Sequence, residues 1–197
     1  LARFWVVIVQ EGGYGRDAAT QSHLDPVLGA DLAARCLDHG GRLLLVRTVS
    51  ERASAADARR APTGRRTAFV AWAGDSPWLT RLTLDDPADL RSMDWAALAV
   101  GSESALAGAA DSPLGSATRA PADPILLVCT NGRRDACCAE RGRAVALAAE
   151  AASPHEAGRP GRVWESSHLG GHRFAPTAVL LPYGHFFGRL SPALGAD

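Results

Sequence analysis

The sequence of 197 residues contains no lysine, so all 21 of its basic side chains are arginines. Together with the alanine-rich composition, this is typical of a bacterial genome of high GC content. Arginine pairs such as Arg59-Arg60 and Arg65-Arg66 therefore carry no weight as motifs. The arginines are balanced by 21 acidic residues, and a net charge of zero gives no electrostatic argument for binding nucleic acid or a membrane surface. We expect neither partner.

Long hydrophobic runs are missing as well. The longest, such as residues 4–9 and 125–129, have the length of a strand and are too short to cross a membrane. The printed sequence does not open with the positively charged segment and apolar core of a secretory leader. A hydrophobic content of 47% and a charged content of 21% are ordinary for a globular protein. We therefore expect a cytoplasmic protein with a well-packed core.

A complete phosphate-binding motif is also absent. Residues 12–15 (Gly-Gly-Tyr-Gly) follow the first predicted strand, as a phosphate loop would. The segment lacks the full Gly-x-Gly-x-x-Gly spacing and has no lysine after it. A nucleotide site is therefore rejected.

Hydrophobic patterning predicts an α/β fold made of two small α/β domains. We predict an N-terminal α/β domain over residues 1–100, a Gly-, Ala-, Ser- and Pro-rich linker over 101–120, and a second domain over 121–197. No sequence repeat is detectable, although both halves share a β-α-β-β-β character. The predicted strands cover 4–9, 43–46, 67–72, 79–84, 125–128, 162–165, 178–181 and 185–190, the predicted helices cover 26–38, 87–98 and 137–152, and an exposed loop covers 50–64.

The four cysteines are clustered. Cys129, Cys137 and Cys138 fall within ten residues, whereas Cys36 lies on the apolar face of a predicted helix and is expected in the core. Adjacent cysteines are poor candidates for bridging each other. Clustered cysteines in a cytoplasmic protein favour metal binding or redox chemistry over disulfide stapling.

The segment 129–138 leaves a buried strand and enters the N-terminus of a helix. Unpaired backbone N–H groups and the helix dipole favour a thiolate at that position. Eight residues separate Cys129 from Cys138, and seven separate it from Cys137. Zinc sites usually take two cysteines with only two to four residues between them, so the wider spacing favours a loop that wraps a larger object.

The second segment is His168-Leu-Gly-Gly-His172. Gly170 and Gly171 favour a tight loop over a helix, because glycine lets the backbone curl so that both imidazoles face one point. Two thiolates and two neutral imidazoles would make a four-ligand set. From spacing alone, structural zinc, thiol chemistry and a site without any metal all stay open.

Together, these segments resemble the sucrase/ferredoxin-like family. The resemblance rests on the Cys-x8-Cys motif with internal Gly-Arg-Arg-Asp at 129–138 and on His-x-Gly-Gly-His-Arg-Phe-Ala at 168–175. Residues 184–190 (Gly-His-Phe-Phe-Gly-Arg-Leu) and 15–18 (Gly-Arg-Asp-Ala) are similar to family segments as well. The resemblance covers most of the chain, although only the first two motifs are specific.

The resemblance implies that the second domain is a thioredoxin-like ferredoxin carrying a [2Fe–2S] cluster. The implied ligands are Cys129, Cys138, His168 and His172, with Cys137 as a neighbour. It further implies electron transfer or redox sensing with a redox partner protein that the sequence does not name, rather than catalysis. The word "sucrase" is not taken as an activity, because no motif places a pair of carboxylates for glycoside hydrolysis.

Two alternatives from other classes remain. One is a thioredoxin-like thiol oxidoreductase that uses Cys129, Cys137 or Cys138, although the Cys-x-x-Cys arrangement of such enzymes is missing. The other is a zinc-stabilised or metal-free interaction module. A [2Fe–2S] protein is red-brown, whereas the other two are colourless.

Overall fold

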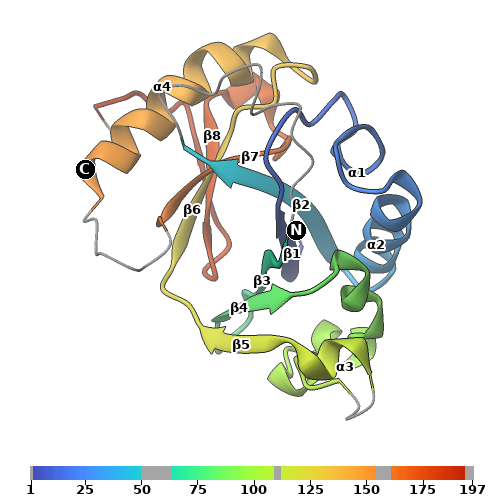
Figure 1. Ribbon diagram of the computed structural model, residues 1–197. Helices are drawn as coiled ribbons and strands as arrows, with labels where there is room; N and C mark the ends of the chain where they lie inside the picture. The colour runs from blue at the N-terminus through green and yellow to red at the C-terminus, as the bar shows by residue number, and fades with distance from the viewer. Residues whose placement is uncertain (1, 50–63, 109–111, 154–160, 194–197) are drawn as a thin grey trace.

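A computed structural model describes residues 2–49, 64–108, 112–153 and 161–193 (Figure 1). All nine strands in these residues belong to one sheet in the order β5-β4-β3-β1-β2-β7-β6-β8-β9. The predicted α/β class is confirmed. The strands are β1 (Phe4–Val9), β2 (Gly41–Thr48), β3 (Arg66–Trp72), β4 (Trp78–Leu84), β5 (Thr118–Pro121), β6 (Ile125–Cys129), β7 (Val163–Ser166), β8 (Thr177–Leu181) and β9 (His185–Gly188).

The helices are fewer and mostly short. No helix in the described part of the chain is both long and apolar enough to cross a membrane. The α-helices are α1 (Ala18–Gln21), α2 (Pro26–Asp38), α3 (Trp95–Ala99) and α4 (Ala136–Ala152), and the 3-10 helices are η2 (Pro87–Ser92), η3 (Glu103–Leu106), η4 (Pro113–Ser116) and η5 (His172–Phe174).

Three expectations about chain organisation have different outcomes. The helix predicted over 87–98 is wrong in its continuity, because Met93 has extended backbone and Asp94 caps a new helix after it. The loop predicted over 50–64 lies almost wholly outside the described residues. The predicted linker contains η3, η4 and β5, which pairs with β4. The division into two domains stays a prediction.

The two halves of the sheet repeat one topology. In the first half, β1 pairs parallel with β2 and antiparallel with β3, and β3 pairs antiparallel with β4. In the second half, β6, β7, β8 and β9 repeat these pairings in the same order. The parallel register is also the same, because Phe4 pairs with Gly41 and Leu126 pairs with Val163, each 37 positions further on (41−4 and 163−126). The antiparallel pair β2–β7 joins the halves.

The crossover helices of the two halves begin alike. Asp25 accepts a hydrogen bond from the backbone N–H of Leu28 at the start of α2. Asp135 accepts one from the backbone N–H of Cys137 at the start of α4. A carboxylate at this position satisfies a free N–H group and the positive end of the helix dipole.

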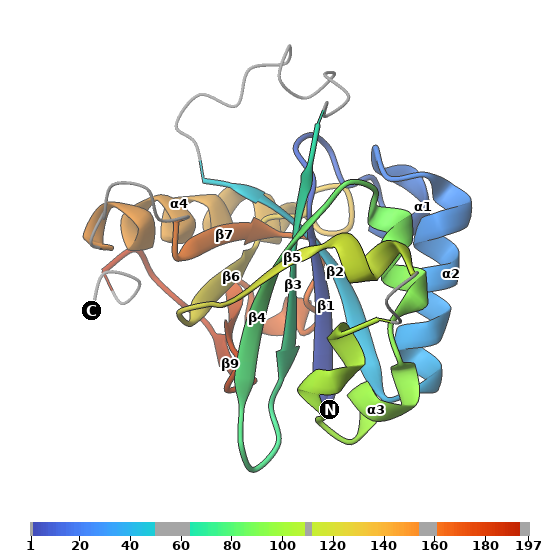
Figure 2. The same cartoon turned by 60° about the horizontal axis from the view of Figure 1, so that its bottom comes forward.

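The core has three parts. Helix α2 and the segment from η2 to η4 cover one face of the first half, and α4 covers the second half (Figures 1 and 2). The other face is closed by the sheet itself, since one cluster combines side chains from β1, β2, β3, β4, β6, β7 and β8, including Trp5, Phe69 and Trp164. The sheet must therefore bend around that face, and this curvature brings strands of both halves together.

Gly142 sets how closely α4 approaches β6. A Cβ at this position would lie 2.1 Å from the carbonyl oxygen of Cys129, a distance that no packed atom pair tolerates. The helix therefore needs glycine there, despite the low helix propensity of this residue.

We predict that Gly142→Ala destabilises the protein, although alanine favours a helix by about 1 kcal/mol over glycine. Ala144 on the exposed side of the same helix provides the matched control, and Ala144→Gly should cost about 1 kcal/mol. Urea unfolding of the two variants measures both effects. A more stable Gly142→Ala variant would contradict the proposed contact.

Candidate metal centre

Three of the predicted site residues converge in the second half of the sheet. Cys129 is the last residue of β6, Cys138 lies in the first turn of α4, and His168 follows β7. Their potential ligand atoms all lie within 4.8 Å of one another, and the Cys129 Sγ atom is 3.9 Å from His168 Nδ1. One strand-to-helix segment and a loop about 30 residues further along the chain thus offer two sulfur atoms and one nitrogen to one point.

The surroundings of this group favour neutral side chains. Both cysteines are fully buried. Burial raises the pKa of Cys138 to about 12, and the nearby Cys129 contributes to the same increase. Burial, with the positive charges of Arg134 and Arg42, lowers the pKa of His168. A neutral imidazole keeps a lone pair for a metal, and two adjacent thiols lose their protons when a cation binds them. The donor set therefore fits a thiophilic metal centre.

His172 and Cys137 lie outside this three-residue group. His172 begins η5 and is exposed, and Cys137 is exposed beside Cys138. The tight loop expected between the two histidines is present, with φ of 89° at Gly170 and 69° at Gly171. The remaining cysteine of the chain, Cys36, is buried in the core as expected.

Arg42 on β2 holds the histidine loop in place. Its Nη1 donates to the carbonyl of Leu169 at 2.6 Å, and its Nη2 donates to the carbonyl of His168 at 2.7 Å. Ser167 adds two contacts to Leu45, accepting from its backbone N–H and donating to its carbonyl. The first half of the chain therefore positions the histidine of the second half. Sequence analysis missed Arg42, since nothing in a chain rich in arginine marks one arginine from another.

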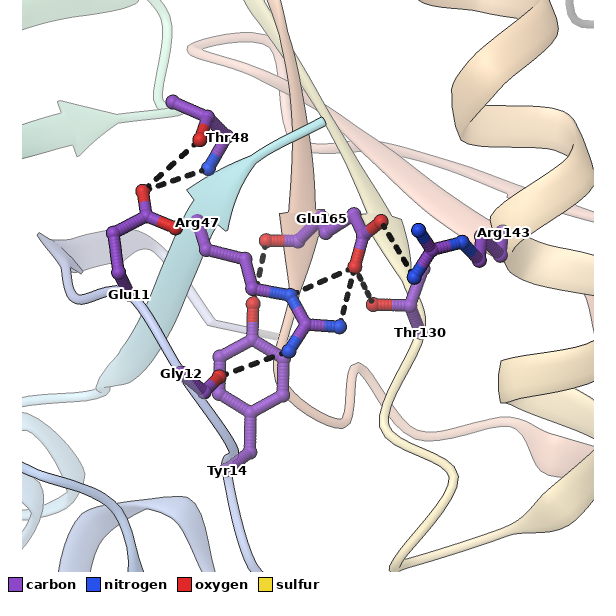
Figure 3. Close-up of polar contacts among 8 residues, drawn as sticks. All are labelled: Glu11, Gly12, Tyr14, Arg47, Thr48, Thr130, Arg143 and Glu165. Atoms are coloured by element: carbon purple, nitrogen blue, oxygen red, sulfur yellow. Dashed lines mark hydrogen bonds and ion pairs between the residues drawn. The ribbon is translucent and has the colours of Figure 1, made fainter. Parts of the chain in front are cut away.

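A buried ion pair lies where the two halves meet (Figure 3). Glu165 on β7 is 1% exposed. Arg47, its partner in the β2–β7 register, donates to the Glu165 carboxylate from Nε at 2.8 Å and from Nη2 at 2.5 Å. Arg47 also donates to the carbonyl of Gly12 at 2.9 Å, and its guanidinium lies 4.9 Å from the ring centre of Tyr14. The pair thus connects the loop after β1 to the strands at the junction.

Further contacts connect Glu165 to the ligand-bearing elements. Thr130, directly after Cys129, donates to its carboxylate at 3.1 Å, and Arg143 of α4 lies 3.9 Å away. Tyr14 donates to its backbone carbonyl at 2.8 Å, and burial raises the pKa of Tyr14 well above its ordinary value. Cys129 therefore lies next to a residue that contacts Glu165, and Cys138 lies on a helix that contacts it. His168 follows Glu165 by three positions in the sequence.

The first half lacks an equivalent donor set. Val9 ends β1 as Cys129 ends β6, and Leu28 is the third residue of α2 as Cys138 is the third of α4. Val9 pairs with Val46 as Cys129 pairs with Ser166, so Thr48 corresponds to His168. Two apolar residues and a threonine cannot ligate a soft metal. Among the described residues, the positions of the first half that correspond to the three-residue group therefore offer no comparable set of ligand atoms.

Comparison with known proteins gives one match. A sequence model of the family described as sucrase/ferredoxin-like matches residues 17–194. No curated protein and no solved structure matches the chain. The matched range includes both halves of the sheet apart from β1, and all the candidate ligands.

We predict that Arg47→Met costs about 3 kcal/mol of the free energy of unfolding, because it leaves the buried Glu165 carboxylate without its main partner. Arg65→Met is the matched control. Arg65 pairs with Asp85 at a site where both side chains are more than half exposed, so its loss should cost no more than about 0.5 kcal/mol. Chemical denaturation of both variants measures the difference, and equal losses would disprove the special role of the buried pair.

Proposed function

Because the chain belongs to the sucrase/ferredoxin-like family, we propose that it is an iron–sulfur redox protein with a [2Fe–2S] cluster. Cys129, Cys138, His168 and His172 would hold the cluster. The observation that carries the proposal is the convergence of two buried thiols and a neutral imidazole within 4.8 Å. When bound, the cluster would supply one-electron transfer.

His172 is the ligand that the described geometry supports least directly. It is exposed and stands outside the three-residue group, but only the two glycines and Leu169 separate it from His168. Gly170 and Gly171 both have positive φ, and because glycine adopts either sign of φ readily, the part of the loop after the Arg42 contacts can reorient. Closure of the ligand set would need the loop to turn His172 toward the thiols.

The mixed ligand set has an electrostatic consequence. Two neutral imidazoles in place of two thiolates make the set less negative by two charges, which favours the reduced state and raises the reduction potential. Arg42 and Arg134 add positive charge near His168, and this effect has the same sign. We propose electron transfer or redox sensing with a partner protein, in the cytoplasm, as the role of the chain.

We predict roughly two irons per chain in anaerobically purified protein, with visible absorption bands that bleach on reduction with dithionite. Cys129→Ala, Cys138→Ala and His168→Ala should each lose most of the iron and colour. Cys137→Ala is the matched control, because this thiol is exposed and outside the group, and it should keep both. Colourless protein with one zinc per chain would favour a structural metal site instead, and retention of iron in Cys138→Ala would refute the ligand assignment.

We predict that His168→Cys and His172→Cys each lower the midpoint potential, by roughly 100 mV, because each replaces a neutral ligand by an anionic one. His185→Cys serves as the control, since His185 lies on β9 and outside the ligand set. Spectroelectrochemical titration of the three variants gives the potentials. An unchanged potential in His172→Cys would remove His172 from the ligand set and leave the other three residues in place.

A further inference from the structure

A second concave site lies beside the histidine loop. It is a groove of about 970 Å³ lined by aromatic side chains, with walls from β1, the start of β2, η5, β8 and β9. We call it the aromatic groove. The residues that define it here are Trp5, Phe174, Thr177, Phe186, Phe187 and Arg189. Gly170 and Gly171 also line it, so the loop that joins His168 to His172 forms part of its wall.

The groove exposes an unusual amount of aromatic surface. Phe174 is 51% exposed, Phe186 is 43% exposed and Phe187 is 40% exposed. The chain has only five phenylalanines, so three of them gather at this one surface. Exposed apolar surface concentrated in one concave place is typical of a ligand site.

The groove also carries uncompensated positive charge. Neither aspartate nor glutamate occurs among the described residues that line it, whereas Arg42 and Arg189 both do. The Arg189 guanidinium lies 5.5 Å from the ring centre of Phe174, and neither arginine forms an ion pair with a described carboxylate. An anionic group would therefore be attracted to the aromatic wall.

Two buried hydrogen-bonding groups in the lining lack partners. The Trp5 indole N–H and the Thr177 hydroxyl belong to side chains that are 2% and 5% exposed, and neither has a hydrogen-bond partner among the described residues. Buried donors without partners are rare and costly. Both polar atoms are themselves closed off from the surface, so a molecule in the groove would make its contacts with the aromatic rings and the arginines instead.

We infer that the aromatic groove binds a planar aromatic small molecule that carries an acidic substituent, an aromatic sulfonate or carboxylate in chemical class. The rings would stack on the phenylalanines, and the anion would pair with Arg189. Binding depends only on the groove. A role for the bound molecule in exchanging electrons with the protein rests on the proposed function, because the groove and the candidate ligands share the histidine loop.

The probe is 1,4-naphthoquinone-2-sulfonate, measured by equilibrium dialysis against the purified full chain, with Cys137→Ala in every sample because quinones add to exposed thiols. Saturation at one molecule per chain is expected. Phe174→Leu should weaken binding roughly threefold to tenfold through loss of aromatic stacking. Arg189→Gln should weaken it up to roughly fivefold, and uncharged 1,4-naphthoquinone should bind the wild type and Arg189→Gln equally. Arg141→Gln, on the exposed face of α4, is the matched control and should bind as the wild type does.

Absence of saturable binding, or equal affinities of the sulfonate for the wild type, Phe174→Leu and Arg189→Gln, would overturn the inference. A change in the sedimentation coefficient of Phe174→Leu without probe binding would also overturn it, by making the groove a contact between copies of the chain. Melting curves of each variant show that the fold is intact. Iron analysis of the same samples separates the two hypotheses, since a protein without iron that binds the probe would refute the proposed function and support the groove.

Discussion

Glu165 carries the only buried carboxylate among the residues that the structure describes. A charge at 1% exposure is stable only with partners that replace its lost hydration. Arg47 supplies the main one from β2, the one described strand of the first half that pairs with the second half. Thr130 and Arg143 add contacts from the segments that follow Cys129 and Cys138. The partners of this one group therefore connect β2 to β7, to the residue after Cys129 and to helix α4.

The two halves share a topology, but only one of them carries the candidate ligands and the other supports them. The second half supplies the thiols and imidazoles, and the first half, with Val9, Leu28 and Thr48 at the corresponding positions, cannot bind a metal in the same way. It instead supports the site from outside. Arg42 fixes the histidine loop by two backbone carbonyls, and Arg47 fixes the strand that leads into it. A single sheet makes this support rigid, because β2 and β7 are hydrogen-bonded neighbours.

The loop from His168 to Phe174 has two sides with different chemistry. His168 faces the buried thiols, whereas the backbone of Gly170 and Gly171 and the ring of Phe174 line the aromatic groove. Leu169 and Arg42 also line the groove, and Arg42 donates to the carbonyls of His168 and Leu169. A molecule in the groove would therefore sit one loop away from the candidate metal centre.

The sequence by itself determined the local features of this protein. Hydrophobic runs predicted the α/β class, glycines predicted the tight histidine loop, and the spacing of Cys129 and Cys138 marked a strand-to-helix loop, because each depends on neighbouring residues. Tertiary structure decided the rest. Arg47 and Glu165 are 118 positions apart, and Arg42 is 126 positions from His168. In a chain whose basic residues are all arginine, only the curvature and pairing of the sheet select the few that hold the site.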